Sequence, residues 1–138
     1  NFIAAPAFTY SSVCGHQGFG LLAHETGHYL GLRHPFPQVF KNIQEAENYM
    51  RAHGNKPSAF DGDGLEDTPP DPYIQDEKIQ CGTVTFVNVN GIDFPLLRSN
   101  IMTYYDHRST LTPQQIERAR KVMEARLQNG MAIPPNFR

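Results

Sequence analysis

Three histidines in the segment HETGHYLGLRH have the spacing of a metal site. His24 and His28 are four residues apart, so on a helix their imidazoles project from the same face, one turn apart. Gly31 lets the chain turn away after the helix, and His34 can then return as a third ligand. Three protein nitrogens around Zn²⁺ leave one position open, which is the arrangement of a catalytic zinc site. The segment therefore predicts chemistry at a zinc ion.

Glu25 is rotated by about 100° from His24 around the same helix. Its carboxylate would lie beside the metal and not on it, where it can take a proton from the attacking water. A bare H-E-x-x-H also occurs by chance in soluble helices, but Gly31 and His34 add two fixed positions that a chance match would not supply. The other histidines lack such spacing and are interpreted as surface or capping residues: His16, His53 and His107.

The segment SNIMTYYD lies further along the chain. Together with the histidine segment it resembles the metzincin zinc peptidases, whose pattern is H-E-x-x-H-x-x-G-x-x-H followed by a methionine-containing turn. The resemblance implies that Met102 forms an apolar floor beneath the zinc ligands. It also implies that Tyr104 is a movable ligand or a hydrogen-bond donor to the oxyanion. Without the zinc motif, Met102 would be interpreted as an ordinary core residue.

Two further segments are similar to those of the pappalysin-like branch of metzincins, DGDGLEDTPPDP and NIMTYYDHRSTLTPQQIERAR. The resemblance extends over residues 18–127. It implies a zinc-dependent endopeptidase that hydrolyses peptide bonds of a protein or peptide substrate, with Glu25 as the general base.

The part of the chain before the zinc motif is short for this branch, whose members have an upper subdomain ahead of the active-site helix. Here 23 residues precede His24. We therefore expect residues 1–138 to be the C-terminal part of a metallopeptidase catalytic domain, weakly active alone, with its upstream subdomain missing or supplied by another chain. The alternative is a non-catalytic surface or assembly module that retains a metzincin site. Glu25 argues against it, because a structural zinc needs no general base.

The segment DGDGLEDT predicts a second ion site. Its carboxylate and hydroxyl oxygens suit Ca²⁺, and relatives in this branch use calcium in the same neighbourhood. The spacing is not that of an EF-hand, and a solvated acidic turn is the alternative. The predicted ligands are Asp61, Asp63, Asp67 and Thr68.

Cys14 and Cys81 permit one disulfide, and two unrelated buried thiols are the alternative. Millimolar extracellular Ca²⁺ can fill even a weak site, and a secreted peptidase does not digest its own cell. We therefore expect a secreted or extracellular location, the cell surface included, with the two cysteines bonded.

Length and charge exclude several classes of protein. The 138 residues suffice for one domain, and the net charge of −2 offers no basic field for nucleic acid. The apolar runs are too short for a membrane span.

The elements that must position the site are predicted from local patterns. We expect helices over 18–30 and 42–52, the latter capped by Asn42, then a long loop over 53–75 and a hairpin over 83–94 that turns at Asn90-Gly91. A last helix starts after Thr112 with a capping box, and Phe2–Ala5 is a short strand.

The predicted fold class is α+β, a metzincin-like domain consisting mainly of its active-site helix and C-terminal subdomain, with the upper N-terminal sheet largely absent. The predicted buried stripes are Ile43, Ala46, Tyr49 and Met50 in one helix and Ile116, Ala119, Met123 and Leu127 in the last.

Overall fold

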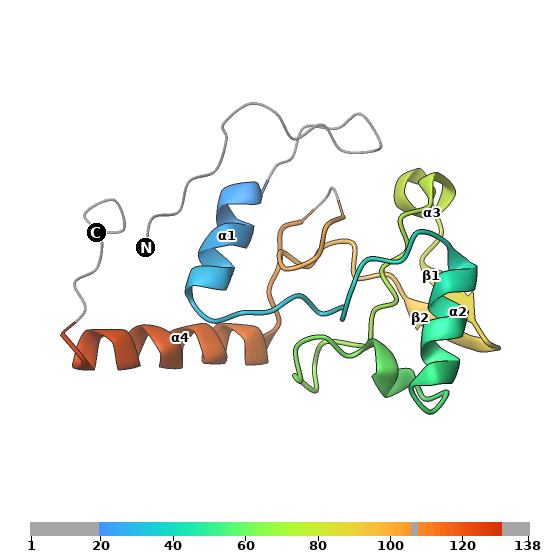
Figure 1. Cartoon of the computed structure of the whole chain (residues 1–138). Helices are drawn as coiled ribbons and strands as arrows, with labels where there is room; N and C mark the ends of the chain where they lie inside the picture. Colours follow the sequence, from blue (N-terminus) through green and yellow to red (C-terminus); the bar gives the residue numbers. More distant parts are fainter. Residues whose placement is uncertain (1–19, 106–107, 131–138) are drawn as a thin grey trace.

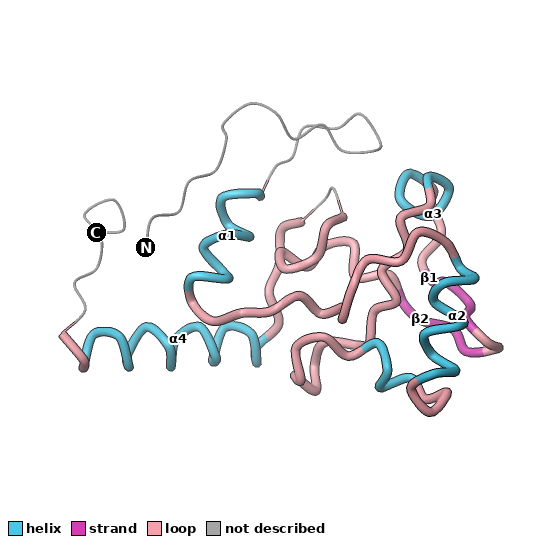
Figure 2. Tube along the Cα trace, in the orientation of Figure 1, coloured by secondary structure: helices cyan, strands magenta, loops and turns pink. Residues whose placement is uncertain are grey.

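The structure, a computed structural model, describes residues 20–105 and 108–130. These residues form helices, one 3₁₀ turn and a two-stranded antiparallel sheet (Figures 1 and 2). In chain order the elements are α1 (Leu21–Tyr29), α2 (Ile43–Ala52), η1 (Pro57–Phe60), α3 (Glu77–Cys81), β1 (Phe86–Val89), β2 (Ile92–Pro95) and α4 (Pro113–Gln128). The mixture confirms the α+β class. The predicted strand Phe2–Ala5 lies outside the described residues.

The elements fall into two groups. Figure 1 shows α1 and α4 at one end of the molecule and α2, α3 and the β1–β2 hairpin at the other. The main apolar core lies at the hairpin end and consists of Phe40, Ala46, Met50, Phe60, Ile74, Ile79, Val87, Val89 and Phe94. A smaller aromatic cluster contains Phe36, Tyr73 and Tyr105. Leu96 packs against both clusters and so connects them.

The end of α1 is a Schellman motif, which sends the chain sharply away from the helix. Leu32 N–H donates to the Gly27 carbonyl at 2.9 Å, and Gly31 N–H donates to the His28 carbonyl at 3.0 Å. Gly31 has φ +82°, a conformation that favours glycine. A Cβ at this position would also lie 2.8 Å from Val122 of α4. The predicted stop at Gly31 is confirmed, and it has a packing reason as well as a backbone reason.

The predicted cap of α2 and the predicted hairpin turn are also confirmed. The Asn42 side chain accepts a hydrogen bond from Glu45 N–H at 2.9 Å. Asn90 and Gly91 have φ of 50° and 82°, and these two left-handed residues match the twist of the flanking strands.

The last helix, α4, begins with the predicted capping box. Thr112 Oγ1 accepts from Gln115 N–H at 3.2 Å, and Gln115 Oε1 accepts from Thr112 N–H at 2.9 Å. Pro113 occupies the first position, where its missing N–H costs nothing. No helix in the described part of the chain is both long and apolar enough to cross a membrane.

Two predicted buried stripes are wrong in part. Ile43 of α2 is 39% exposed, and in α4 Ile116 is 55% and Leu127 48% exposed. The reason in α4 is that the helix turns a different face inward, with Gln115 fully buried and Val122 against the turn after α1. The buried face of α4 therefore contains the hydrogen-bonded side chain of Gln115 where the apolar period predicted Ile116.

Residues 53–75, predicted as a structureless loop, are anchored to the core. The segment contains η1, whose Phe60 is completely buried. Ile74, at the end of the segment, forms an isolated parallel bridge with Phe40. The next helix, α3, was not predicted, although Asp76 caps it with its side chain. Its five residues are too few to show a helical period.

Asp71, near the end of this segment, is a completely buried carboxyl. Neither of its oxygens nor the Tyr105 hydroxyl has a hydrogen-bond partner of good geometry among the described residues. Burial raises the pKa of Asp71 to about 7, and its interaction with the Tyr105 hydroxyl offsets only part of that rise.

The buried carboxyl of Asp71 should make the free energy of unfolding depend on pH. The folded state keeps a proton that the unfolded chain releases above pH 3.8, so this contribution to stability is lost as the pH rises to about 7. We expect Asp71→Asn to gain stability relative to the wild type between pH 4 and pH 8, by roughly 1–4 kcal/mol. Urea unfolding at pH 4 and at pH 8 measures the free energy of unfolding of the variant and of the wild type. Asp93→Asn, on the exposed side of β2, is the control; equal pH dependence of Asp71→Asn and the wild type would contradict the prediction.

Candidate metal centre

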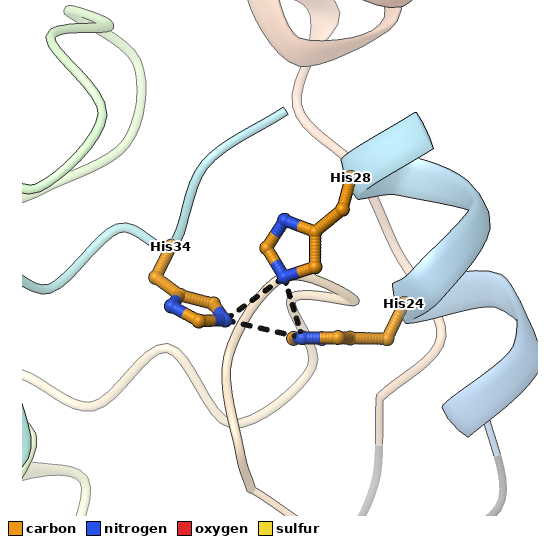
Figure 3. Close-up of side chains that lie close together, drawn as sticks. All are labelled: His24, His28 and His34. Atoms are coloured by element: carbon orange, nitrogen blue, oxygen red, sulfur yellow. Dashed lines mark hydrogen bonds between the residues drawn. The ribbon is translucent and has the colours of Figure 1, made fainter. Parts of the chain in front are cut away.

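The three predicted histidines converge on one point. His24 and His28 project from α1, and His34 returns from the segment after Gly31 (Figure 3). The Nε2 atoms lie 3.1 Å apart between His24 and His28, 3.0 Å between His28 and His34, and 3.2 Å between His24 and His34. The spacing-based prediction that these side chains meet is confirmed.

Backbone carbonyls fix the orientation of two of the rings. His24 Nδ1–H donates to the Ile101 carbonyl at 2.8 Å, and His28 Nδ1–H donates to the Leu32 carbonyl at 2.8 Å. Since a carbonyl only accepts, the proton of each neutral ring is on Nδ1, and each Nε2 presents a lone pair. Two lone pairs 3.1 Å apart repel each other unless a cation lies between them. The donor set is therefore that of a metal site.

The spacing also fits zinc. Nitrogen ligands at 2.0–2.1 Å in a tetrahedral arrangement lie about 3.3 Å from each other. Within residues 20–105 and 108–130, the three histidines are the group in which three ligand atoms of His, Cys, Asp or Glu lie within 4.8 Å of one another.

Burial favours the neutral, metal-binding form of two of the histidines, His24 and His34. His24 is buried, and burial lowers its pKa below the ordinary value. Burial, with the neighbouring rings of His28 and His24, lowers the pKa of His34 to about 4. At neutral pH these two rings are therefore neutral, and no proton needs to leave them before a metal binds.

Met102 lies against Gly27 of α1, the helix that carries two of the histidines. Met102 is completely buried, and a Cβ placed on Gly27 would lie 2.3 Å from its sulfur. Gly27 is thus required for the close approach of α1 to the loop that carries Met102. This role of Gly27 was not predicted, although a glycine inside a helix between two metal ligands was the available signal.

The loop that carries Met102 is fixed by a pair of buried amides. Asn100 Nδ2 donates to Gln115 Oε1 at 2.8 Å, and Gln115 Nε2 donates to Asn100 Oδ1 at 3.2 Å. Asn100 Oδ1 also accepts from Met102 N–H at 2.9 Å. Gln115 is at the same time part of the α4 capping box, so the loop is tied directly to the start of α4.

Two aromatic rings pack around His34. The Phe36 ring is stacked on His34 at 4.8 Å between centroids, with 6° between the planes. The Tyr104 ring lies 4.7 Å from His34 and 5.4 Å from His24. The structure thus places the Tyr104 ring next to two of the histidines, and the role that the resemblance implies for it stays a prediction. Phe36 was missed, because a single aromatic residue after a motif carries no signal of its own.

Glu25 follows His24 on α1 and is half-buried. In the part of the chain that the structure describes, its carboxylate takes part in no hydrogen bond or ion pair. It is therefore a carboxylate one residue from a metal ligand, and its charge acts on the His24 ring without a described hydrogen bond.

The acidic loop uses part of its oxygens internally. Asp61 Oδ1 accepts two backbone N–H groups of the loop, at 2.8 and 3.1 Å. Asp63 Oδ1 accepts the Thr68 hydroxyl at 2.7 Å, and Asp67 Oδ2 accepts a backbone N–H of α4 at 2.9 Å. Asp63 Oδ2 and Asp67 Oδ1 are buried without a described partner. These carboxylates do not form a described group of three converging ligands, and the calcium site stays a prediction.

The remaining predicted residues have separate outcomes. His53 hydrogen-bonds through Nδ1 to the Tyr49 carbonyl at 2.7 Å, at the end of α2, which is the capping role expected of it. Cys81 ends α3 and is not a free thiol. Three residues lie outside the described ranges, Cys14, His16 and His107, so the Cys14–Cys81 disulfide stays a prediction.

Three converging imidazoles, from a helix and from the segment after it, form a three-histidine metal centre. A protein-family model described as pregnancy-associated plasma protein-A matches residues 8–124. The chain therefore belongs to this peptidase family, M43, the pappalysin family of metzincins. The predicted resemblance and the metzincin-like fold class are thereby confirmed. Searches of curated proteins and of solved structures each gave no match.

The contact between Gly27 and Met102 generates a prediction. Gly27→Ala should destabilise the protein by about 1–3 kcal/mol through overpacking, whereas the same change in an unobstructed helix stabilises by about 1 kcal/mol. It should also weaken zinc binding, because the helix must move away from the loop. Urea unfolding and zinc titration measure the two effects. Ala23→Gly, at an exposed position of the same helix, is the control; a gain of stability in Gly27→Ala would contradict the prediction.

Proposed function

We propose that this chain is a zinc-dependent endopeptidase that hydrolyses peptide bonds of protein or peptide substrates. The observation that carries the proposal is the convergence of three Nε2 atoms within 3.2 Å, with Glu25 beside them. Membership of a metallopeptidase family supports it independently.

Each residue of the centre has a role on this proposal. His24, His28 and His34 hold zinc, which when bound polarises the scissile carbonyl and lowers the pKa of a water molecule. Glu25 takes the proton of the attacking water and passes it to the leaving amine. Tyr104 donates a hydrogen bond to the developing oxyanion, an interaction that is often worth about 10²–10³ in rate.

The alternative from another class is a zinc-binding module without turnover that takes part in an assembly. Its ligands would be the same three histidines, so the metal alone does not discriminate. Glu25 does, because a zinc ion that only holds an assembly together needs no general base beside it. We therefore favour the enzyme, with a protein or peptide substrate as its partner.

Separate substitutions at Glu25 and His34 test the proposal. Glu25→Gln should keep one zinc per chain and lower kcat/KM on a quenched casein peptide by about 10²–10⁴. His34→Ala should weaken zinc binding at least about 100-fold, beyond the effect usual for residues that only orient a ligand. Metal analysis and peptidase assays measure the two.

His53→Ala is the matched control, since it removes an imidazole at an exposed position outside the centre. It should leave zinc content and activity unchanged. Full peptidase activity in Glu25→Gln would refute the general base, and unchanged zinc affinity in His34→Ala would refute the three-histidine site.

We propose in addition that the acidic loop binds Ca²⁺. Support comes from the buried free oxygens of Asp63 and Asp67, which lie in one loop and lack described partners. Millimolar Ca²⁺ should raise the melting temperature by about 2–8 °C, and Asp63→Asn should abolish the rise. Mg²⁺ at the same concentration is the control. A rise that persists in Asp63→Asn would place the effect elsewhere.

The proposed location is extracellular. Members of the family are typically extracellular, and calcium is abundant there. The predicted Cys14–Cys81 bond fits the same compartment, because disulfides persist in oxidising surroundings.

A further inference from the structure

Arg108 is a buried cation beside the metal centre that the proposed mechanism does not use. The residue is 7% exposed. Nη1 donates to the Thr103 carbonyl at 3.0 Å and lies 3.4 Å from His24 Nδ1. Since the Nδ1 proton of His24 already goes to Ile101, the Arg108–His24 contact is not a hydrogen bond. Arg108 Nε is buried and has no partner among the described residues.

No described carboxylate compensates this charge. The ion pairs within residues 20–105 and 108–130 lie on α2 and α4, and Arg108 belongs to none of them. Burying a cation is costly, so buried arginines are normally paired with an anion. The Arg108 guanidinium is held in place and has a buried N–H without a described acceptor, so it is suited to bind an anion.

The start of α1 adds a second positive feature at the same place. Its N-cap residue, Gly20, has no side chain to accept a hydrogen bond, and the first turn contains no acidic residue. A Cβ on Gly20 would lie 3.4 Å from the Arg108 carbonyl oxygen, so the helix start adjoins Arg108. Helix N-termini carry partial positive charge and free N–H groups, and both favour anions.

Two other roles explain these observations less well. Holding the Thr103 carbonyl requires one donor and does not require an unpaired charge. Strengthening zinc binding is excluded by the sign of the charge, since a nearby cation repels a divalent cation.

We propose that Arg108, together with the start of α1, binds a carboxylate of the substrate close to the scissile bond. The preferred substrates are then peptides with an acidic side chain next to the cleaved bond, or peptides whose C-terminal carboxylate lies there. The shared chemistry is one carboxylate, accepting from the guanidinium. The inference rests on the proposed function in that it takes the ligand to be a peptide.

Peptide hydroxamates test the proposal without relying on turnover. The hydroxamate chelates zinc and so fixes the register of the peptide on the centre. One pair carries Glu or Gln at the residue next to the hydroxamate. A second pair carries Gln there and ends one residue later in a free carboxylate or an amide. Calorimetry on the zinc-loaded full chain gives the Kd of each compound.

We expect at least one carboxylate compound to bind about tenfold more tightly than its neutral partner. The pair that shows the difference identifies the source of the carboxylate. In Arg108→Gln the ratio should fall to about one, and Arg120→Gln, which removes the same charge from the exposed face of α4, should leave it unchanged.

Equal Kd values within both pairs of the wild-type chain, or no binding, would overturn the proposal. So would a preference that survives in Arg108→Gln. If that variant does not retain zinc, Arg108→Lys decides, since losing the planar fork should lower the ratio several-fold, and an unchanged ratio overturns the proposal. A wild-type chain that cleaves no peptide would refute the peptidase and still show the carboxylate preference.

Discussion

His24 uses both of its ring nitrogens, and the metal centre depends on that double use. Nδ1–H donates to the carbonyl of Ile101, while Nε2 faces the other two imidazoles. The hydrogen bond joins α1 to a loop far along the chain, so the ring is oriented only when both segments are in place. Because the carbonyl accepts only, it also sets the tautomer, which leaves the lone pair of Nε2 for a metal. Folding and metal binding are thus coupled through one side chain.

The loop in turn is held by a closed series of contacts. Asn100 and Gln115 exchange amide hydrogen bonds, and Gln115 belongs to the capping box that starts α4. Further along α4, Arg118 Nε donates to the Gly31 carbonyl at 3.0 Å, and the helix packs there on the turn after α1. The series therefore returns to the segment that carries His34. Buried amides that are fully paired fix one arrangement, because losing either partner leaves the other unsatisfied in the interior.

The features that the sequence predicted correctly each depend on a few neighbouring residues. The histidine spacing, the Schellman turn at Gly31, the Asn90-Gly91 turn and the Thr112 cap each depend on neighbours in the chain, and all are present. What it missed depends on contacts between distant segments. Gly27 matters because of Met102, and Gln115 is buried because of Asn100, so no local pattern marks either. The apolar period of α4 pointed to the wrong face for the same reason. Arg108 gave no signal, since one arginine in a loop is by default a solvated charge.

Positive charge exceeds negative charge around the three histidines. All three ligands are imidazoles, and burial keeps His24 and His34 neutral, so no ligand carboxylate reduces the charge of a divalent ion. Arg108 adds a further positive charge behind His24, and the start of α1 adds a partial one. Glu25 is the described carboxylate adjacent to the ligands, and it is half-buried on the helix and not coordinated. Such a centre stabilises negative charge wherever it arises, whether on a carbonyl oxygen during hydrolysis or on a carboxylate that the substrate brings. On our proposals, catalysis and substrate preference therefore have the same physical origin, an excess of positive charge at the centre.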